Sequence, residues 1–141
     1  MVAANSRHIA AMAAAFAMLA FPAVAEMVHY KADLSAQTEV PPNDSTATGS
    51  ADVSIDTDAK TVSWTVTYDG LTGDATAAHI HGPASETENA APMIVLDPID
   101  KGTAEITDEQ MSDVKAGKTY VNVHTEMHPD GEIRGQLMEA K

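Results

Sequence analysis

The chain has 141 residues, with 8 lysines and arginines against 21 aspartates and glutamates, and it has no cysteine. Its formal net charge of −13 at pH 7 argues against binding to nucleic acid or to anionic lipid, both of which need basic surfaces. Without cysteine there are no disulfides, thiolate metal sites or cysteine nucleophiles, so a metal site has to use histidine, methionine or carboxylate ligands.

Residues 1–25 have the pattern of a secretory signal peptide. After a weakly basic start, an apolar run spans residues 9–21, and the small residues Ala23 and Ala25 form an A-x-A cleavage site. The run is short and rich in alanine for a membrane span, although an uncleaved membrane anchor is the alternative. We expect cleavage after Ala25 and export to the periplasm or the medium. The mature single domain is then residues 26–141, without contact to a membrane.

The mature segment has the pattern of an all-β domain, because runs rich in Val, Ile, Thr and Tyr alternate with clusters of Gly, Pro, Asn and Asp. Residues 50–56 and 61–70 alternate apolar and polar side chains across a short connection, which predicts a hairpin. Pro41 and Pro42 indicate a loop before it. The predicted strands span residues 27–34, 50–56, 61–70, 76–81, 93–96, 119–124 and 131–138.

One helix is predicted after these first strands. Thr107 is suited to be its N-cap, Asp108 and Glu109 lie in its first turn, and Gly117 is suited to end it. About seven or eight short antiparallel strands with one short helix predict a Greek-key β-sandwich or barrel.

Four of the six histidines gather in two short segments, AHIHGPA and VNVHTEMH. His79 and His81 lie two residues apart in a predicted strand, so they project from the same face with Cβ atoms ~6.5–7 Å apart. His124 ends another predicted strand and completes a three-nitrogen site if the two strands lie near each other. His128, in the following loop, is a further candidate ligand. The alternative is that these histidines only serve the fold.

Imidazole ligands suit copper, zinc and nickel, and ligand type alone does not separate them. Copper(II) tops the affinity series and takes tetragonal nitrogen sites, so we expect copper, with zinc as the alternative. The sequence has neither a nucleophile elbow nor a glycine-rich phosphate loop. A metal ion is therefore the one partner that the residues indicate, and no protein partner is indicated.

Several ordered motifs resemble the CHRD domain, a module named after the extracellular protein chordin and also found alone in secreted bacterial proteins. The resemblance covers residues 28–137 and implies an exported β-sandwich. It implies less about function. In chordin the modules belong to a protein that binds growth factors, so a metal-free interaction module is a second hypothesis. The matching motifs are LSAQTEVPP (34–42), VSWTVTYDGLTG (62–73), AAHIHGPA (77–84), ITDEQMSDVKAGKTYVNVHT (106–125) and GEIRGQL (131–137).

A more distant similarity to copper/zinc superoxide dismutases concerns the order of site residues. Those Greek-key barrels bind copper through an H-x-H pair and a histidine on a late strand, followed by an arginine near the copper. Here His79, His81, His124 and Arg134 come in the same order, and no histidine occurs within residues 82–122 to bridge two metals.

That similarity implies a copper-only, dismutase-like site, in which Arg134 would steer an anion to the metal. Whether the chain is an enzyme stays open, and a salt bridge on the sheet is the alternative for Arg134. The leading hypothesis is an exported copper-binding protein with a mononuclear site. Its ligands come from His79, His81, His124 and His128.

Overall fold

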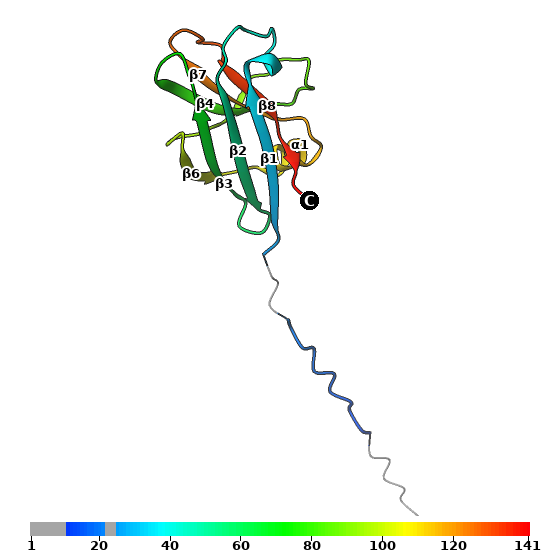
Figure 1. Ribbon diagram of the computed structural model, residues 1–141. Coiled ribbons are helices and arrows are strands. Elements are labelled where there is room, and N and C mark those ends of the chain that lie inside the picture. The colour runs from blue at the N-terminus through cyan, green and yellow to red at the C-terminus, as the bar shows by residue number, and fades with distance from the viewer. Residues whose placement is uncertain (1–10, 22–24) are drawn as a thin grey trace, which may run out of the picture.

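The computed structural model describes residues 11–21 and 25–141. Within them, nine strands join in one antiparallel sheet that curls into a nearly closed barrel (Figure 1). Every predicted strand is present, and the last one is divided in two. The elements are β1 (Met27–Ser35), the 3₁₀ turn η1 (Ala36–Thr38), β2 (Thr48–Asp56), β3 (Thr61–Asp69), β4 (Ala75–His81), β5 (Pro92–Val95), β6 (Lys101–Glu105), α1 (Asp108–Lys115), β7 (Tyr120–Thr125), β8 (Ile133–Gln136) and β9 (Met138–Glu139).

The order of strands in the sheet is β5-β4-β7-β8-β1-β2-β3-β6, and β9 pairs with β1. Strands that are distant in the chain are therefore neighbours in the sheet, as β4 and β7 are. The predicted antiparallel β class with one short helix is confirmed. The strand β6 had no clear signal in the sequence, because it is short and does not alternate apolar with polar side chains.

The predicted hairpin is formed by β2 and β3. Its register runs from Asp56 opposite Thr61 to Thr48 opposite Asp69. The Asp56 carboxylate accepts hydrogen bonds from the backbone N–H groups of the two residues at the start of the turn, 58 and 59. Such a side-chain cap on the turn fixes the register, and the register decides which face of each strand is buried.

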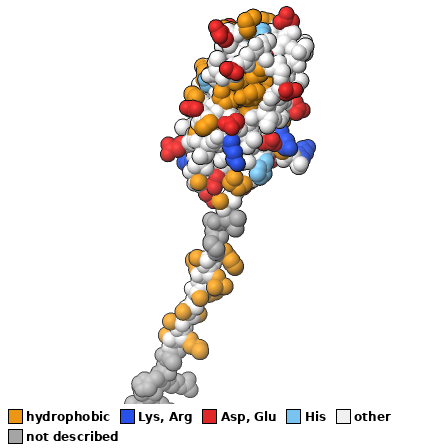
Figure 2. All heavy atoms as spheres, turned by 60° about the vertical axis from the view of Figure 1, so that its left-hand side comes forward, with side chains coloured by type: hydrophobic (Ala, Val, Ile, Leu, Met, Phe, Trp, Pro, Cys, Tyr) orange, Lys and Arg blue, Asp and Glu red, His pale blue; other side chains and the backbone are white. Residues whose placement is uncertain are grey.

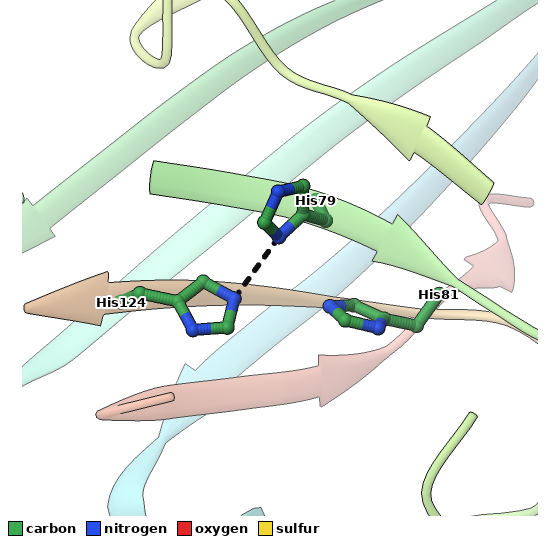
Figure 3. Close-up of side chains that lie close together, drawn as sticks. All are labelled: His79, His81 and His124. Atoms are coloured by element: carbon green, nitrogen blue, oxygen red, sulfur yellow. Dashed lines mark hydrogen bonds between the residues drawn. The ribbon is translucent and has the colours of Figure 1, made fainter. Parts of the chain in front are cut away.

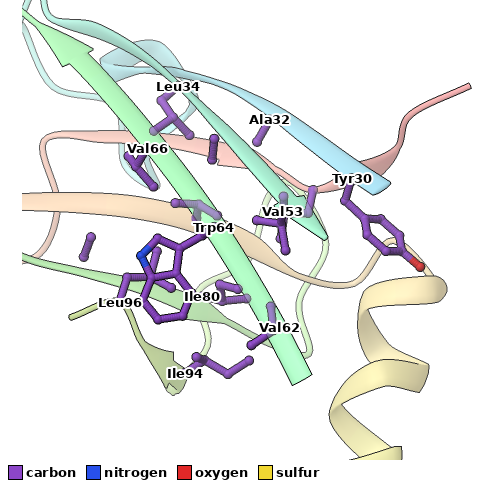
Figure 4. Close-up of a cluster of buried hydrophobic side chains, with 14 of the residues drawn as sticks. Tyr30, Ala32, Leu34, Val53, Val62, Trp64, Val66, Ile80, Ile94 and Leu96 are labelled. Atoms are coloured by element: carbon purple, nitrogen blue, oxygen red, sulfur yellow. The ribbon is translucent and has the colours of Figure 1, made fainter. Parts of the chain in front are cut away.

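The core lies inside the barrel, where side chains of alternating residues meet (Figure 4). Val62, Trp64 and Val66 of β3 are buried, and the Trp64 indole N–H donates to the carbonyl of Pro98 at 2.9 Å. The far side of the barrel adds Ile80 from β4. This core orients β4 and β7, because their apolar side chains must point inward and every second side chain must then point outward.

The helix α1 begins and ends as the sequence predicts. Thr107 is the N-cap, and its side chain forms a capping box with Gln110. Asp108 and Glu109 lie in the first turn, where acidic side chains interact favourably with the helix dipole. Gly117 follows the helix with a φ of 72°, a conformation that glycine adopts at little cost.

Residues 11–21 have no regular secondary structure and extend away from the barrel (Figure 1). Their apolar side chains are exposed, whereas acidic side chains surround the face of the barrel in Figure 2. Residues 1–10 and 22–24 lie outside the described residues, and they include most of the expected cleavage motif. The signal peptide of residues 1–25 thus stays a prediction. No helix of the described residues is long and apolar enough to cross a membrane.

Candidate metal centre

The pairing of β4 with β7 brings the two histidine segments together on the outer face of the barrel. His79 stands opposite Asn122, and His81 opposite Tyr120. His124 stands opposite Ala77, one step further along the sheet. The three imidazoles consequently lie together over this face of β4 and β7 and share one space (Figure 3). The alternation of side chains had predicted this shared face for His79 and His81.

The three rings are close enough to share one ion. One nitrogen from each of His79, His81 and His124 lies within 4.8 Å of the other two. His79 Nδ1 and His124 Nε2 are 3.1 Å apart (Figure 3). Two nitrogens bound to one metal by bonds of ~2 Å lie ~3 Å apart, so this pair already has the separation of two ligands. The His81 nitrogen lies within 4.8 Å of both, so it has to move by no more than ~2 Å to join them.

Backbone carbonyls hold two of the rings from behind. The Nδ1 of His124 lies 2.8 Å from the carbonyl oxygen of Pro129, and the Nδ1 of His81 lies 2.9 Å from that of Ala90. A carbonyl oxygen can only accept, so Nδ1 carries a proton in both rings. Nε2 of both rings faces the shared space, where that of His124 lies near His79 and that of His81 bonds to Asn122. Metal-bound histidines are oriented by the same kind of bond.

The site also favours neutral imidazoles, which are the form that binds metal. Burial lowers the pKa of His79, and the nearby His124 and His81 lower it further. Burial also lowers the pKa of His81, although hydrogen bonds to Ala90 and Asn122 oppose that effect. Both lowered pKa values favour the neutral form of these rings.

A comparison with protein families decides the relationship of the chain. The family model of the CHRD domain matches residues 30–137, well over half of the sequence. The chain belongs to the CHRD domain family. Searches of curated proteins and of solved structures gave no match. The family thus confirms the resemblance seen in the sequence, while the likeness to superoxide dismutases has no support beyond the order of residues.

His128 of this CHRD domain lies apart from the three histidines. It sits in the turn after β7, where its backbone N–H and carbonyl bond to Thr125 and its carbonyl also accepts from Gly131. Its Nε2 is 3.9 Å from Glu132 Oε1. The structure therefore brings together three of the four predicted ligands, and His128 contacts a buried carboxylate instead.

Arg134 lies behind the site and is almost completely buried. Its guanidinium carbon is 3.5 Å from the ring centroid of Tyr120, and the Tyr120 ring stacks on His81 at a centroid distance of 4.8 Å. Its Nη1 donates to Asn89 Oδ1, and its Nη2 donates to the carbonyls of Ser85 and Glu88. This arginine anchors the loop between β4 and β5 over the sheet. Tyr120 separates it from His81, and anion steering stays a prediction without a supporting contact.

Asn122 belongs to the same face and was not among the predicted site residues. It is 2 % exposed, and its Oδ1 lies 2.8 Å from His81 Nε2. Its Nδ2 donates to the carbonyl of Asp130 at 3.4 Å. The sequence had placed Asn122 on one face with Tyr120 and His124. The sequence feature that could have indicated its role is a polar amide between two aromatic side chains, Tyr120 and His124, on one face of the strand.

Glu39 reaches the same region from the loop after β1. The residue is 6 % exposed, and its Oε1 has no hydrogen-bond partner among the described residues. Burial raises the pKa of Glu39 to about 7, against the opposing effects of Arg134 and Asn122. Nothing in the sequence indicated this residue, because the chain between residues 36 and 47 reads as a plain polar loop.

Proposed function

We propose that this CHRD-domain protein is exported and binds one copper ion through His79, His81 and His124. The observation that carries the proposal is the pair of hydrogen bonds from His81 and His124 to backbone carbonyls. These bonds orient both rings and aim their Nε2 atoms at the space that His79 faces. If these histidines served only the fold, there would be no reason for all three rings to face the same space.

Copper is favoured over other metals by the donor set. Three neutral imidazoles suit copper(II), which binds more tightly than zinc to a given set of nitrogen ligands. Zinc is the alternative, since it accepts the same ligands in a tetrahedral arrangement. The acidic surface would draw cations of either kind toward the protein without selecting between them.

A metal-free interaction module is the second candidate function. One contact favours it: His81 Nδ1 bonds to Ala90 in the loop between β4 and β5, so this histidine also holds the loop in place. A dismutase-like activity has less support. It needs a cation exposed beside the copper, whereas the guanidinium of Arg134 is buried and occupied by the same loop.

Export is proposed from the N-terminal sequence and has its own test. The protein is expressed from the full reading frame in a bacterium, and the mass of the product in the periplasm and the medium is measured. Cleavage after Ala25 is the expected result. An uncleaved product that stays with the membrane fraction would support the anchor instead.

Copper binding is tested by titration of the full chain with Cu(II), followed by EPR. We expect one equivalent with nitrogen hyperfine structure, and loss of that equivalent in His79→Gln. His29→Gln is the matched control, because His29 bonds to Ser54 and lies on β1, which pairs with neither β4 nor β7. No stoichiometric binding, or equal loss in both variants, would favour the interaction module.

A further inference from the structure

We propose that Asn122 supplies a fourth donor to the metal, so that the protein offers three imidazole nitrogens and one amide oxygen. This inference rests on the proposed copper site and adds its donor set and its preferred oxidation state. Asn122 stands on β7 directly opposite His79, and on the same outward face as His124. Its side chain therefore leaves the strand at a point between the three imidazole rings.

The amide oxygen lies where a ligand is needed. His81 Nδ1 lies 2.9 Å from the carbonyl oxygen of Ala90, and its Nε2 forms a hydrogen bond of 2.8 Å with Asn122 Oδ1. A metal ion that takes the place of the proton in this bond, and releases that proton, would have both donors beside it. Two donors at right angles on one copper ion, with bonds of ~2 Å, lie ~2.8 Å apart. The separation of the nitrogen and the oxygen is that of neighbouring ligands.

The loop after β7 fixes which end of the amide faces the rings. Asn122 Nδ2 donates to the carbonyl of Asp130, which leaves Oδ1 toward His81. Gly131 allows this arrangement. Its φ is +124°, and a Cβ there would collide with Asn122 Nδ2 and would come within 2.5 Å of Glu39 Oε1. The loop can close over the amide only because this residue has no side chain. The oxygen is oriented before any metal binds.

The fourth donor predicts a preference between the two copper oxidation states. An amide oxygen is a hard, neutral donor, and tetragonal sites of nitrogen and oxygen suit Cu(II). Cu(I) prefers softer ligands and gains little from such an oxygen. Removal of the oxygen should thus weaken Cu(II) binding and leave Cu(I) binding nearly unchanged. A residue that only positioned His81 would affect both ions alike.

The test compares Asn122→Leu and Asn122→Asp with the unmodified full chain. Cu(II) affinity is measured by competition with a chelator, Cu(I) affinity by an anaerobic competition, and the Cu(II) sites by EPR. Leucine keeps the approximate shape without the oxygen, and we expect Cu(II) affinity to fall about tenfold or more, with Cu(I) affinity within about threefold. Aspartate keeps the oxygen and adds charge. It should tighten Cu(II) binding and change the EPR parameters. Circular dichroism of the metal-free variants confirms that they fold.

Three results would overturn the inference while the copper site itself stands. Equal losses for Cu(II) and Cu(I) in Asn122→Leu would make Asn122 a positioning residue for His81. Tighter binding of both ions in that variant would show that the hydrogen bond between Asn122 and His81 competes with the metal. Unchanged affinities and EPR in both variants would remove Asn122 from the site. Failure of the proposed function is distinguishable from these results. In that case the unmodified protein would bind no stoichiometric copper, or His79→Gln would bind it equally well.

Discussion

The outward face of β1–β2–β3 and the outward face of β4–β7–β8 are built differently. In β1 and β3 buried and exposed residues alternate, and the outward side chains meet water. Lys31 and Asp52 there form an exposed ion pair at 3.5 Å. In β7 all six residues are buried. Its outward side chains Tyr120, Asn122 and His124 lie beneath loops that fold back over the sheet.

On the second face, polar side chains are buried at positions where apolar side chains would stabilise the fold more. A buried polar side chain is unfavourable unless its hydrogen bonds are made, and apolar residues under the same loops would serve stability better. The chain keeps two histidines and an amide there, each with fixed partners. Polar groups that are buried and ordered without a need of the fold are typical of a binding site.

The largest effect on stability is expected from Glu132→Ala, beside this second face. The Glu132 side chain is fully buried and accepts from Ser45, Thr72 and Thr125. Burial opposes its charge, but these hydrogen bonds lower the pKa of Glu132 overall. Alanine leaves the buried hydroxyls of Ser45 and Thr125, and the N–H and hydroxyl of Thr72, without this acceptor. Urea unfolding should therefore show a loss of about 3–5 kcal/mol. Asp52→Ala, which breaks only the exposed pair, should stay within about 1 kcal/mol. Equal losses would contradict the contrast between the two faces.

A second variant should separate stability from metal binding. Ile55→Ala removes a buried side chain from the inner face of β2. We expect unfolding in urea to show a loss of about 2–4 kcal/mol, since a cavity is left behind. Copper affinity should not change in the folded protein, because β2 contributes no ligand. A loss of affinity above about threefold would mean that the two faces are coupled through the core.

The same contrast explains how much of the fold could be predicted. The hairpin of β2 and β3 was predicted because Val53, Ile55, Val62 and Trp64 alternate with polar residues that face water. The strand β6 (Lys101–Glu105) was not predicted, because KGTAE is a short, mostly polar edge segment. It forms a strand because β3 offers it hydrogen-bonding partners, which is a long-range cause that local patterns do not record.

The candidate site was predicted as far as strand periodicity reaches. Alternation placed His79 and His81 on one face, and it placed His124 with Asn122. It could not show that β4 pairs with β7 in the register that joins these faces. Nor could it show that the loop carrying Asn89 folds over Arg134, or that Glu39 comes from a distant loop. These placements depend on tertiary contacts between distant segments.

Glu39→Gln should change how stability depends on pH. The folded pKa of about 7 lies above the ordinary value of 4.5, so the protonated carboxyl favours the folded state. This contribution is complete below about pH 4.5 and is lost as the pH rises through 7. Relative to Glu39→Gln, the unmodified protein should lose about 1–3 kcal/mol between pH 4.5 and 8. Urea unfolding of both proteins at several pH values gives the difference in their free energies of unfolding. The histidines titrate in both proteins, so their contribution cancels in this difference. A difference independent of pH would show that Glu39 is already ionised when folded.

The smallest effect on the metal-free protein is expected for His79→Gln. His79 is partly exposed, and its one side-chain hydrogen bond goes to His124. Thermal unfolding without metal should therefore change by no more than about 0.5 kcal/mol. With free Cu(II) at a hundred times its dissociation constant, the unmodified protein should gain about 2.7 kcal/mol, and the variant should gain almost none. This pairing matters because Ile55→Ala should do the reverse, losing stability and keeping copper. If His79→Gln unfolded the protein without metal, the outward face would be part of the fold, and the contrast between the two faces would fail.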